Sequence, residues 1–397
     1  MIAERINRIS PSETMKISAR AKELQRQGHS VVALSQGEPD FKTPDYICDA
    51  AIQAIKDGHH GYTVNTGNIE LRELICQKLK EENNLTYSPD QIVVSNGAKQ
   101  SLGFSILATI NPGDEVIIPA PYWVSYPEMV KLAEGEPVIV RTQVENQYKI
   151  TPDELRNALS SKTKMLILCS PSNPTGSCYT RNELENLVAV LSEYPDVLVL
   201  SDEIYEYITY GQDHVGIGEI SEDIKNRTLV TNGFSKGFAM TGWRLGYLAA
   251  PKEVAEATAR IQSQETSAPS SISQKAGEAA YSHPRDDIKK MRDAFQKRRD
   301  YVVSELSNID GLTCFTPEGA FYVFPDVSSY IGTKTSDGEP INNSTDLCMY
   351  LLEKHGLALV PGDAFGEPQG LRISFAASQQ MLEDGIKRLK TGLEELQ

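Results

Sequence analysis

Lys164-Met-Leu-Ile-Leu168 and Val197-Leu-Val-Leu200 are largely apolar runs of strand length, and a helical pattern at Arg181–Leu191 separates them. A strand, a helix and a second strand in this order predict a crossover connection between parallel strands. Uninterrupted apolar runs are typical of strands that are buried on both faces. This unit therefore predicts an α/β fold, with a mostly parallel sheet between two layers of helices.

The same alternation continues on both sides of this unit. Further strands are expected at residues 31–34, 91–95, 115–118, 137–141, 228–231 and 245–249. Helices are expected at residues 12–27, 44–56, 69–82, 98–109, 124–133, 152–159 and 285–306. After the last helix, short strands expected at 321–324, 357–360 and 371–374 predict a second, smaller α+β unit.

Composition and charge exclude several classes of protein. The chain has 397 residues, 40% of them hydrophobic, and 39 basic against 54 acidic residues give a net charge of −15. This charge repels a phosphate backbone, so we expect no nucleic-acid partner. No apolar run approaches the roughly 20 residues of a membrane helix, and the N-terminal segment lacks the apolar region of a signal peptide, so a cytoplasmic protein is expected. The six cysteines include no C-x-x-C pair and are expected to be reduced, with no metal site.

Polar residues follow several of the predicted strands, at the sheet edge where open parallel sheets bind ligands. Gly97 and Ala98 open a helix whose free N–H groups suit an anion, although a plain turn has the same pattern. Trp123 lies on a loop and suits either packing or ligand binding. Asn173 precedes a proline, a pattern that turns also use. Asp202 directly follows four apolar residues and a serine, so it is either a helix cap or a carboxylate beside a buried cation.

The segment Gly233-Phe-Ser-Lys-Gly237 follows another strand and contains an unusual lysine. Glycines, a serine and apolar residues surround Lys236, which predicts a desolvated ammonium with a lowered pKa, as a lysine that forms an imine requires. Pyridoxal phosphate needs such a lysine, an acid at its ring nitrogen, donors for its phosphate and a flat group over its ring. Those needs are met in turn by Lys236, by Asp202, by the Gly97/Ala98 turn with Ser235 and Arg244, and by Trp123.

Several longer motifs extend over the whole chain. They include Pro11-Ser-Glu-Thr14, Gly37-Glu-Pro-Asp-Phe41, Tyr62, Pro121-Tyr-Trp-Val-Ser-Tyr-Pro-Glu128, Asn173-Pro-Thr-Gly176, Asp202-Glu-Ile-Tyr205, Ser235-Lys236, Thr241-Gly-Trp-Arg244, Gly319-Ala-Phe-Tyr322 and Arg372-Ile-Ser374. With these motifs the sequence resembles the fold-type I, class I aminotransferases that use pyridoxal phosphate. It is most similar to the bacterial aspartate aminotransferases, whose relatives also transaminate prephenate to arogenate.

The resemblance implies roles for the cofactor residues. Lys236 would bond to the cofactor and move the proton between the substrate α-carbon and the cofactor. Asp202 would pair with the ring nitrogen, and Trp123 would stack on the ring. Tyr205 and Asn173 would contact the phenolic oxygen. The phosphate would be bound by Ser235, Arg244, Gly97, Ala98 and, from the neighbouring subunit of a homodimer, Tyr62.

The resemblance also implies a substrate pocket. Arg372 would clamp the α-carboxylate of an amino acid or 2-oxo acid in a bidentate pair, beside the main chain of Gly37 and near Trp123 and Asn173. Lys99 would bind the distal carboxylate of aspartate, although a lysine at a helix start can also be an exposed surface group.

Three further positions bear on the choice of substrate. Thr14 matches the threonine that accompanies prephenate use in this branch. However, Ser10 stands where many bifunctional relatives carry lysine, and Glu265 adds a negative charge near the segment in which other aspartate enzymes carry an arginine.

The fold that the resemblance implies has a large domain with a mostly parallel seven-stranded sheet and a smaller α+β domain. We expect residues 1–43 to form an N-terminal arm and part of the small domain. Residues 44–290 would form the large cofactor domain, and residues 291–397 the rest of the small domain.

Rival interpretations stay open at this point. The segment around Lys236 also matches the G-x-S-x-G pattern of serine hydrolases, with Ser235 as nucleophile and His355 as the candidate base. That alternative leaves Asp202, Arg244 and Arg372 without roles. A transcription regulator with an aminotransferase-like domain would need an added DNA-binding module. Alanine, aromatic and N-succinyldiaminopimelate aminotransferases differ from aspartate enzymes in the distal pocket.

Overall fold

Seven strands form the central sheet in the computed structural model of the protein, which describes residues 2–10 and 13–396. In spatial order they are β2 (Ile92–Ser95), β8 (Gly246–Ala249), β7 (Thr228–Gly233), β6 (Leu198–Asp202), β5 (Thr163–Cys169), β3 (Glu115–Ala120) and β4 (Glu136–Arg141). Strand β8 runs antiparallel to both of its neighbours, β2 and β7, and the pairs from β7 to β4 are parallel. The predicted α/β fold with a mostly parallel seven-stranded sheet is confirmed.

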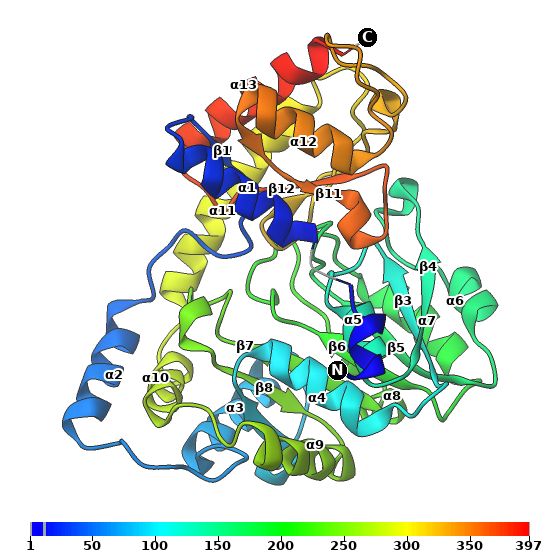
Figure 1. Ribbon diagram of the computed structural model, residues 1–397. Coiled ribbons are helices and arrows are strands. Elements are labelled where there is room, and N and C mark those ends of the chain that lie inside the picture. The colour runs from blue at the N-terminus through cyan, green and yellow to red at the C-terminus, as the bar shows by residue number, and fades with distance from the viewer. Residues whose placement is uncertain (1, 11–12, 397) are drawn as a thin grey trace.

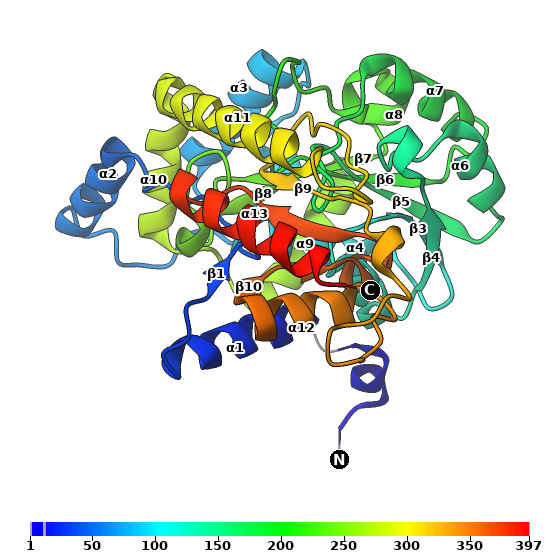
Figure 2. The same ribbon diagram turned by 90° about the horizontal axis from the view of Figure 1, so that it is seen from above.

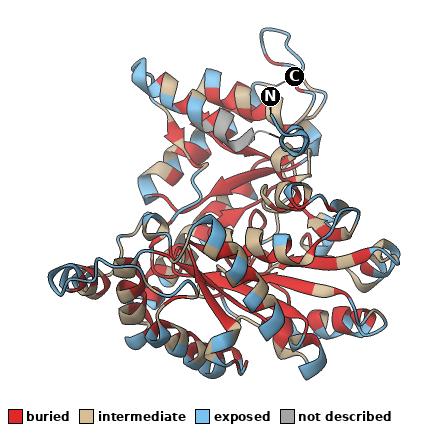
Figure 3. Ribbon diagram, turned by 60° about the horizontal axis from the view of Figure 1, so that its bottom comes forward, coloured by how far each residue is buried: buried red, intermediate tan, exposed pale blue. Residues whose placement is uncertain are grey.

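Helices cover both faces of this sheet (Figure 1). Because side chains alternate along a strand, Val116 and Ile118 of β3 pack toward one face and Ile117 toward the other. The first face is covered by α4 (Ala98–Thr109), α5 (Tyr126–Leu132) and α9 (Lys252–Glu265). The second face is covered by α3 (Ile69–Asn83), α6 (Pro152–Ala158), α7 (Arg181–Leu191), α8 (Glu222–Lys225) and α10 (Ser271–Ser282). The strands between these layers are mostly buried, except for the edge strand β4, which is half-buried to exposed along its length (Figure 3).

The two ends of the chain meet in a second group of elements (Figures 1 and 2). The N-terminal part supplies α1 (Glu13–Arg26) and β1 (Val32–Ala33), and α2 (Asp45–Lys56) leads into the large sheet. The C-terminal part supplies α11 (Asp286–Leu306), β9 (Tyr322–Val323), α12 (Ser344–His355), β10 (Leu357–Ala358), β11 (Val360–Pro361), β12 (Leu371–Ser374) and α13 (Gln379–Glu394). Strand β1 pairs in parallel with β10, so residues more than 320 positions apart share one sheet.

One predicted strand is wrong in detail. The apolar run at 357–360 was expected to be a single strand, but it divides into β10, which pairs with β1, and β11, which pairs with β12. The chain leaves one sheet and enters another at Leu359. This change cannot be predicted from the sequence, because the apolar run continues through it without a break.

The domain boundaries stay a prediction. The boundary expected at 290/291 falls inside α11, a helix of 21 residues that runs between the two groups of elements in Figure 1. Among the helices of the described residues, none is both long and apolar enough to cross a membrane.

Candidate active site

The carboxyl ends of the parallel strands open onto a cavity of about 530 Å³. The segments that follow β3, β5, β6 and β7 supply Trp123, Asn173, Tyr205 and Lys236 to its lining. The last strand of the second group, β12, contributes Arg372 from the opposite side. The cavity therefore lies where the large sheet meets the elements built from the chain ends.

Most of the predicted site residues lie together in this cavity. Its lining includes Gly37, Ala98, Lys99, Trp123, Asn173, Asp202, Tyr205, Ser235, Lys236, Arg244 and Arg372. Gly97 does not line the cavity itself, but it precedes Ala98, which does, and it lies against the Arg244 guanidinium. The Tyr62 side chain is fully exposed and does not line the cavity of its own chain. Thr14 belongs to α1, but its side chain lies outside the described part of the structure.

Lys236 lies in the turn that follows β7, a strand buried along its whole length. Its Nζ donates a hydrogen bond of 2.5 Å to the carbonyl of Gly37 and lies 5.9 Å from the centre of the Tyr205 ring. Burial, together with the positive charge of Arg372, lowers the pKa of Lys236 from 10.5 to about 8. At pH 7 a pKa of about 8 leaves about 10% of the amine unprotonated, against about 0.03% for an ordinary lysine. The amine is therefore far more available as a nucleophile and proton acceptor.

Asp202 is the last residue of β6 and is 4% exposed. Tyr126 donates a hydrogen bond of 2.6 Å to its Oδ2, and the Ile204 N–H donates to Oδ1 at 3.3 Å. Burial raises the pKa of Asp202 from 3.8 to about 6, while the Tyr126 bond opposes that rise. A buried carboxylate of this kind is best stabilised by a cationic N–H from a ligand.

The start of α4 forms an anion-binding corner with Arg244. Gly97 has a φ of +81°, which favours glycine, and a Cβ at this position would lie 2.6 Å from an Arg244 guanidinium nitrogen and so displace that side chain. Gly246 is as tightly constrained, because a Cβ there would lie 2.3 Å from the Ala98 nitrogen. The hydroxyl-bearing Ser235 lines the same cavity. The first turn of a 12-residue helix, a guanidinium and a hydroxyl together suit a phosphate.

Arg372 is 6% exposed and lies on the strand β12. It donates to Asn173 Oδ1 at 3.0 Å and to the Ser35 carbonyl at 2.8 Å, and its guanidinium lies 4.5 Å from the centre of the Tyr322 ring. Its buried Nε has no hydrogen-bond partner among the described residues. A buried guanidinium with a free donor is suited to an incoming carboxylate.

Lys99 lies in the first turn of α4, with its Nζ 5.1 Å from the centre of the Trp123 ring. Burial and the nearby positive charge of Arg244 lower the pKa of Lys99. The cavity lining as a whole holds four cations (Lys99, Lys236, Arg244, Arg372) and two carboxylates (Glu38, Asp202). This excess of positive charge suits a ligand with several negative groups.

Two tyrosines of the site were not assigned a role from the sequence, Tyr126 and Tyr322. The predicted helix at 124–133 begins at Tyr126, and this start aims the Tyr126 hydroxyl at Asp202. The Tyr322 hydroxyl lies 2.9 Å from that of Tyr205 and its ring faces Arg372. Both lie inside motifs quoted from the sequence, and these motifs are the signal that could have pointed to them.

The hydrolase alternative lacks its base. Residues 234–239, which follow β7, form turns and no helix, so Ser235 is not held at the start of one. His355 lies in α12, with its Nε2 3.1 Å from the Tyr350 hydroxyl and 3.5 Å from a Glu395 oxygen, and it does not line the cavity.

Comparisons with known proteins identify the family of the chain. Residues 29–389 match the family described as aminotransferase class I and II. The bifunctional aspartate aminotransferase and glutamate/aspartate-prephenate aminotransferase of Petunia hybrida is 50% identical over 396 residues, which are 99% of this chain and 82% of that protein.

Solved structures agree as well. The aspartate aminotransferase of Rhizobium meliloti is 43% identical, with a TM-score of 0.97 and all of both chains covered. The aspartate aminotransferase of Thermus thermophilus, solved with maleate, is 38% identical, with a TM-score of 0.92 and 99% of each chain covered. On these grounds the chain belongs to the class I and II aminotransferases.

Proposed function

We propose that this aminotransferase transfers the amino group of L-aspartate to 2-oxoglutarate, giving oxaloacetate and L-glutamate, with pyridoxal 5'-phosphate as its cofactor. The observation that carries the proposal is the cavity itself. It holds a half-buried lysine of lowered pKa together with two further cations, Arg372 and Lys99, which come from different elements. The lysine would bond to the cofactor, and the two separate cations would each bind one carboxylate of a dicarboxylic substrate.

The residues present fit the cofactor. Bound pyridoxal phosphate supplies an electron-withdrawing ring that makes the α-hydrogen of an amino acid acidic. Asp202 is the group expected at its ring nitrogen, because burial leaves that carboxylate in need of a cationic partner. The Gly97/Arg244 corner, where a Cβ would leave too little room, is expected to hold the phosphate. Ser235 would add a hydroxyl donor there.

Lys236 is the residue expected to hold the cofactor and to move the substrate proton. A pKa of about 8 keeps its Nζ partly unprotonated near neutral pH, and this is the state that accepts a proton. The Gly37 carbonyl, 2.5 Å from Nζ, orients the amine while it is free. Tyr205 and Asn173 would contact the phenolic oxygen, and Trp123 would cover one face of the ring.

The two ends of the substrate are expected at two different cations. Arg372 would bind the α-carboxylate, using its unpartnered Nε together with a terminal nitrogen. Lys99 would bind the distal carboxylate, which offsets the repulsion between this ammonium and the positive end of α4. The related Thermus thermophilus enzyme was solved with maleate, a dicarboxylate, and this supports the same preference here.

A homodimer is proposed as the functional unit. Tyr62 is fully exposed, and three other large apolar residues nearby in sequence, Ile52, Ile55 and Val64, are about half exposed or more. A second copy packed on this segment would bury these side chains and bring Tyr62 to the phosphate of its partner.

A panel of donors and acceptors tests the proposal. The donors are aspartate, glutamate, alanine, phenylalanine and N-succinyldiaminopimelate, and the acceptors are 2-oxoglutarate, oxaloacetate and prephenate. We expect aspartate with 2-oxoglutarate to give the highest kcat/KM, and highest turnover with alanine, phenylalanine or N-succinyldiaminopimelate would overturn the proposal. The prephenate arm tests a second acceptor, which the Petunia hybrida relative and Thr14 support.

A further inference from the structure

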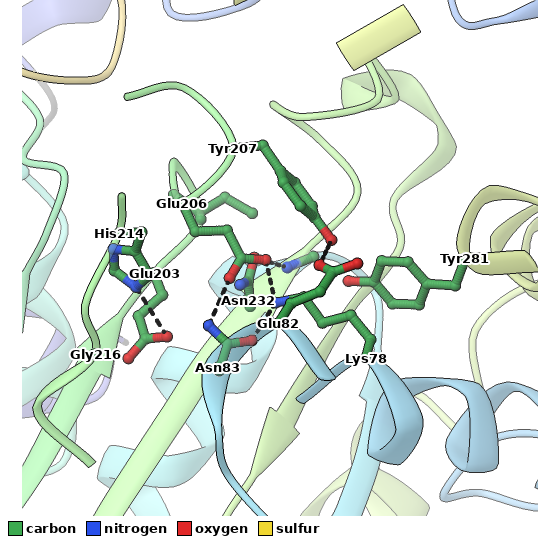
Figure 4. Close-up of polar contacts among 12 residues, drawn as sticks. Lys78, Glu82, Asn83, Glu203, Glu206, Tyr207, His214, Gly216, Asn232 and Tyr281 are labelled. Atoms are coloured by element: carbon green, nitrogen blue, oxygen red, sulfur yellow. Dashed lines mark hydrogen bonds and ion pairs between the residues drawn. The ribbon is translucent and has the colours of Figure 1, made fainter. Parts of the chain in front are cut away.

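A buried polar cluster (Figure 4) includes residues that adjoin Asp202 and Tyr205 of the cavity lining in sequence. It consists of Lys78 and Asn83 of α3, Glu203 and Glu206 of the turn after β6, and His214; we call it the Glu203–Glu206 network. Its side chains are at most 8% exposed. None of them lines the cavity, so the proposed chemistry does not use them directly.

Glu206 is held from α3. The Lys78 ammonium contacts its Oε1, and the Asn83 amide donates to its Oε2 at 3.1 Å. Lys78 also donates to Asn83 Oδ1 at 2.7 Å, so each of these three side chains contacts the other two (Figure 4). Glu206 is thereby fixed to a helix that packs on the far side of the sheet from α4.

Glu203 is held from two other directions. The Ser201 hydroxyl donates to its Oε1 at 2.8 Å, and His214 Nε2 lies 3.3 Å from its Oε2. A Cβ on Gly216 would lie 2.6 Å from Glu203 Oε1, so the chain after His214 packs directly on the carboxylate. Although burial alone lowers it, the pKa of His214 is raised by the adjacent Glu203 carboxylate. Each glutamate therefore has its own nitrogen partner, Lys78 for Glu206 and His214 for Glu203.

A metal ion is a poorer explanation of this cluster. Oxygen or nitrogen atoms of Glu203, Glu206 and His214 lie within 4.8 Å of one another, as in a ligand set. However, the Lys78 ammonium already contacts Glu206, so a cation is in place. A divalent ion there would face Lys78 at close range.

The turn after β6 divides its side chains between the cavity and the network. Asp202, Ile204 and Tyr205 line the cavity, whereas Glu203 and Glu206 enter the network behind it. Only one residue separates Glu203 from Tyr205, and Asp202 and Glu203 are adjacent. The backbone that carries the two glutamates therefore also carries Asp202 and Tyr205, which line the cavity.

We propose that Glu203, Glu206, Lys78 and His214 are positioning residues for transamination, which hold the turn at 202–206 so that Asp202 and Tyr205 meet the cofactor ring. The inference rests on the proposed function. Stability alone does not explain four buried charges, since well-packed apolar residues often stabilise a core as well as a buried ion network does. A fixed orientation of Asp202 and Tyr205 does explain them, because a site needs its contact residues held to within about half an ångström.

The test compares two histidine variants. His214→Phe removes a His–Glu pair from the network, and His355→Phe is the matched control, since it removes the His355–Glu395 pair outside the cavity. Both proteins are titrated with pyridoxal phosphate, and the absorbance of the lysine-bound cofactor is followed against pH. Hydrogen exchange of the amides at 203–206 is measured without cofactor.

The inference predicts three changes in His214→Phe that His355→Phe does not share. Cofactor affinity falls about tenfold, the lower end of the loss that follows removal of a contact supporting the ligands of a metal site. The pH midpoint of the absorbance change rises, because a displaced Tyr205 no longer stabilises the deprotonated form. The amides at 203–206 exchange faster. A folded His214→Phe that matches the control in affinity and midpoint overturns the inference.

Two other outcomes have separate meanings: a His214→Phe protein that does not fold, and an unmodified protein that does not bind the cofactor. If His214→Phe does not fold, Glu203→Gln replaces it, because this change keeps the side-chain volume and an acceptor for Ser201 while removing the charge. The same loss of affinity and rise of midpoint are expected, and an unchanged Glu203→Gln overturns the inference. If the unmodified protein gives no lysine-bound absorbance, the proposed function fails and not the positioning role alone.

Discussion

Replacing Asp202 with asparagine is expected to stabilise the cofactor-free protein while it weakens cofactor binding. Asp202 is 4% exposed, and burial raises its pKa from 3.8 to about 6. A carboxyl whose pKa is higher in the folded state destabilises that state once the pH exceeds the unfolded value. The cost grows between pH 3.8 and about 6 and is constant above that range.

The magnitude follows from the two pKa values. Their difference of about 2 corresponds to about 3 kcal/mol in the free energy of unfolding at pH 8, at about 1.36 kcal/mol for each pKa unit. At pH 5 roughly half of this penalty remains. The Oδ1 of asparagine can still accept the hydrogen bond from Tyr126. Its side-chain nitrogen cannot accept the hydrogen bond from the Ile204 N–H, and this loss costs about 1 kcal/mol. The expected net gain is about 2 kcal/mol at pH 8 and well below 1 kcal/mol at pH 5.

Chemical denaturation of the cofactor-free protein and of Asp202→Asn at both pH values measures this gain, and titration with pyridoxal phosphate measures affinity. We expect the variant to be the more stable protein at pH 8 and to bind the cofactor at least about tenfold more weakly. A variant that is no more stable than the parent at pH 8, or a gain that is larger at pH 5, would refute the argument from burial.

Three other predictions concern the same cavity. Lys99→Ala is expected to lower kcat/KM for aspartate by about tenfold or more and to leave kcat/KM for alanine nearly unchanged, as steady-state kinetics will show; equal losses exclude a distal-carboxylate role. Gly97→Ala places a Cβ 2.6 Å from Arg244 at a φ of +81°, so cofactor affinity should fall about tenfold with little change in helix content by circular dichroism. Unaltered affinity would mean that this corner does not bind phosphate. Tyr126→Phe removes the 2.6 Å bond to Asp202 and should raise the pKa of that carboxyl further, which moves the acid limit of cofactor binding to higher pH. If the acid limit of cofactor binding does not move, the Tyr126 hydroxyl does not influence the pKa of Asp202.

Much of the cavity was predictable because its residues follow apolar runs. Asp202 ends one strand that is buried on both faces and Lys236 lies three residues after another, and the apolar runs of such strands are visible in the sequence. The carboxyl ends of parallel strands share one edge, so residues at these ends meet without any knowledge of packing. Arg372 was assigned by resemblance alone, because its strand belongs to the second group of elements.

The contacts behind the cavity were not predictable in the same way. Lys78 and Glu206 lie 128 positions apart and meet only because α3 packs beside the turn after β6. Neither position shows a periodic pattern that marks a buried charge. Tyr126 was missed for a local reason, since its direction depends on where α5 begins. Long-range packing and helix starts are set by tertiary structure, which a single sequence displays weakly.

The most direct test of the central claim is a single half-reaction. The protein is loaded with pyridoxal phosphate, freed of excess cofactor and mixed with L-aspartate in the absence of any 2-oxo acid, and both absorbance and oxaloacetate are measured. We predict that the violet to near-ultraviolet absorbance of the lysine-bound cofactor is lost as about one oxaloacetate forms for each site, and that Lys236→Ala forms none at a comparable rate. Absence of oxaloacetate, or the same yield and rate from Lys236→Ala, would contradict the account.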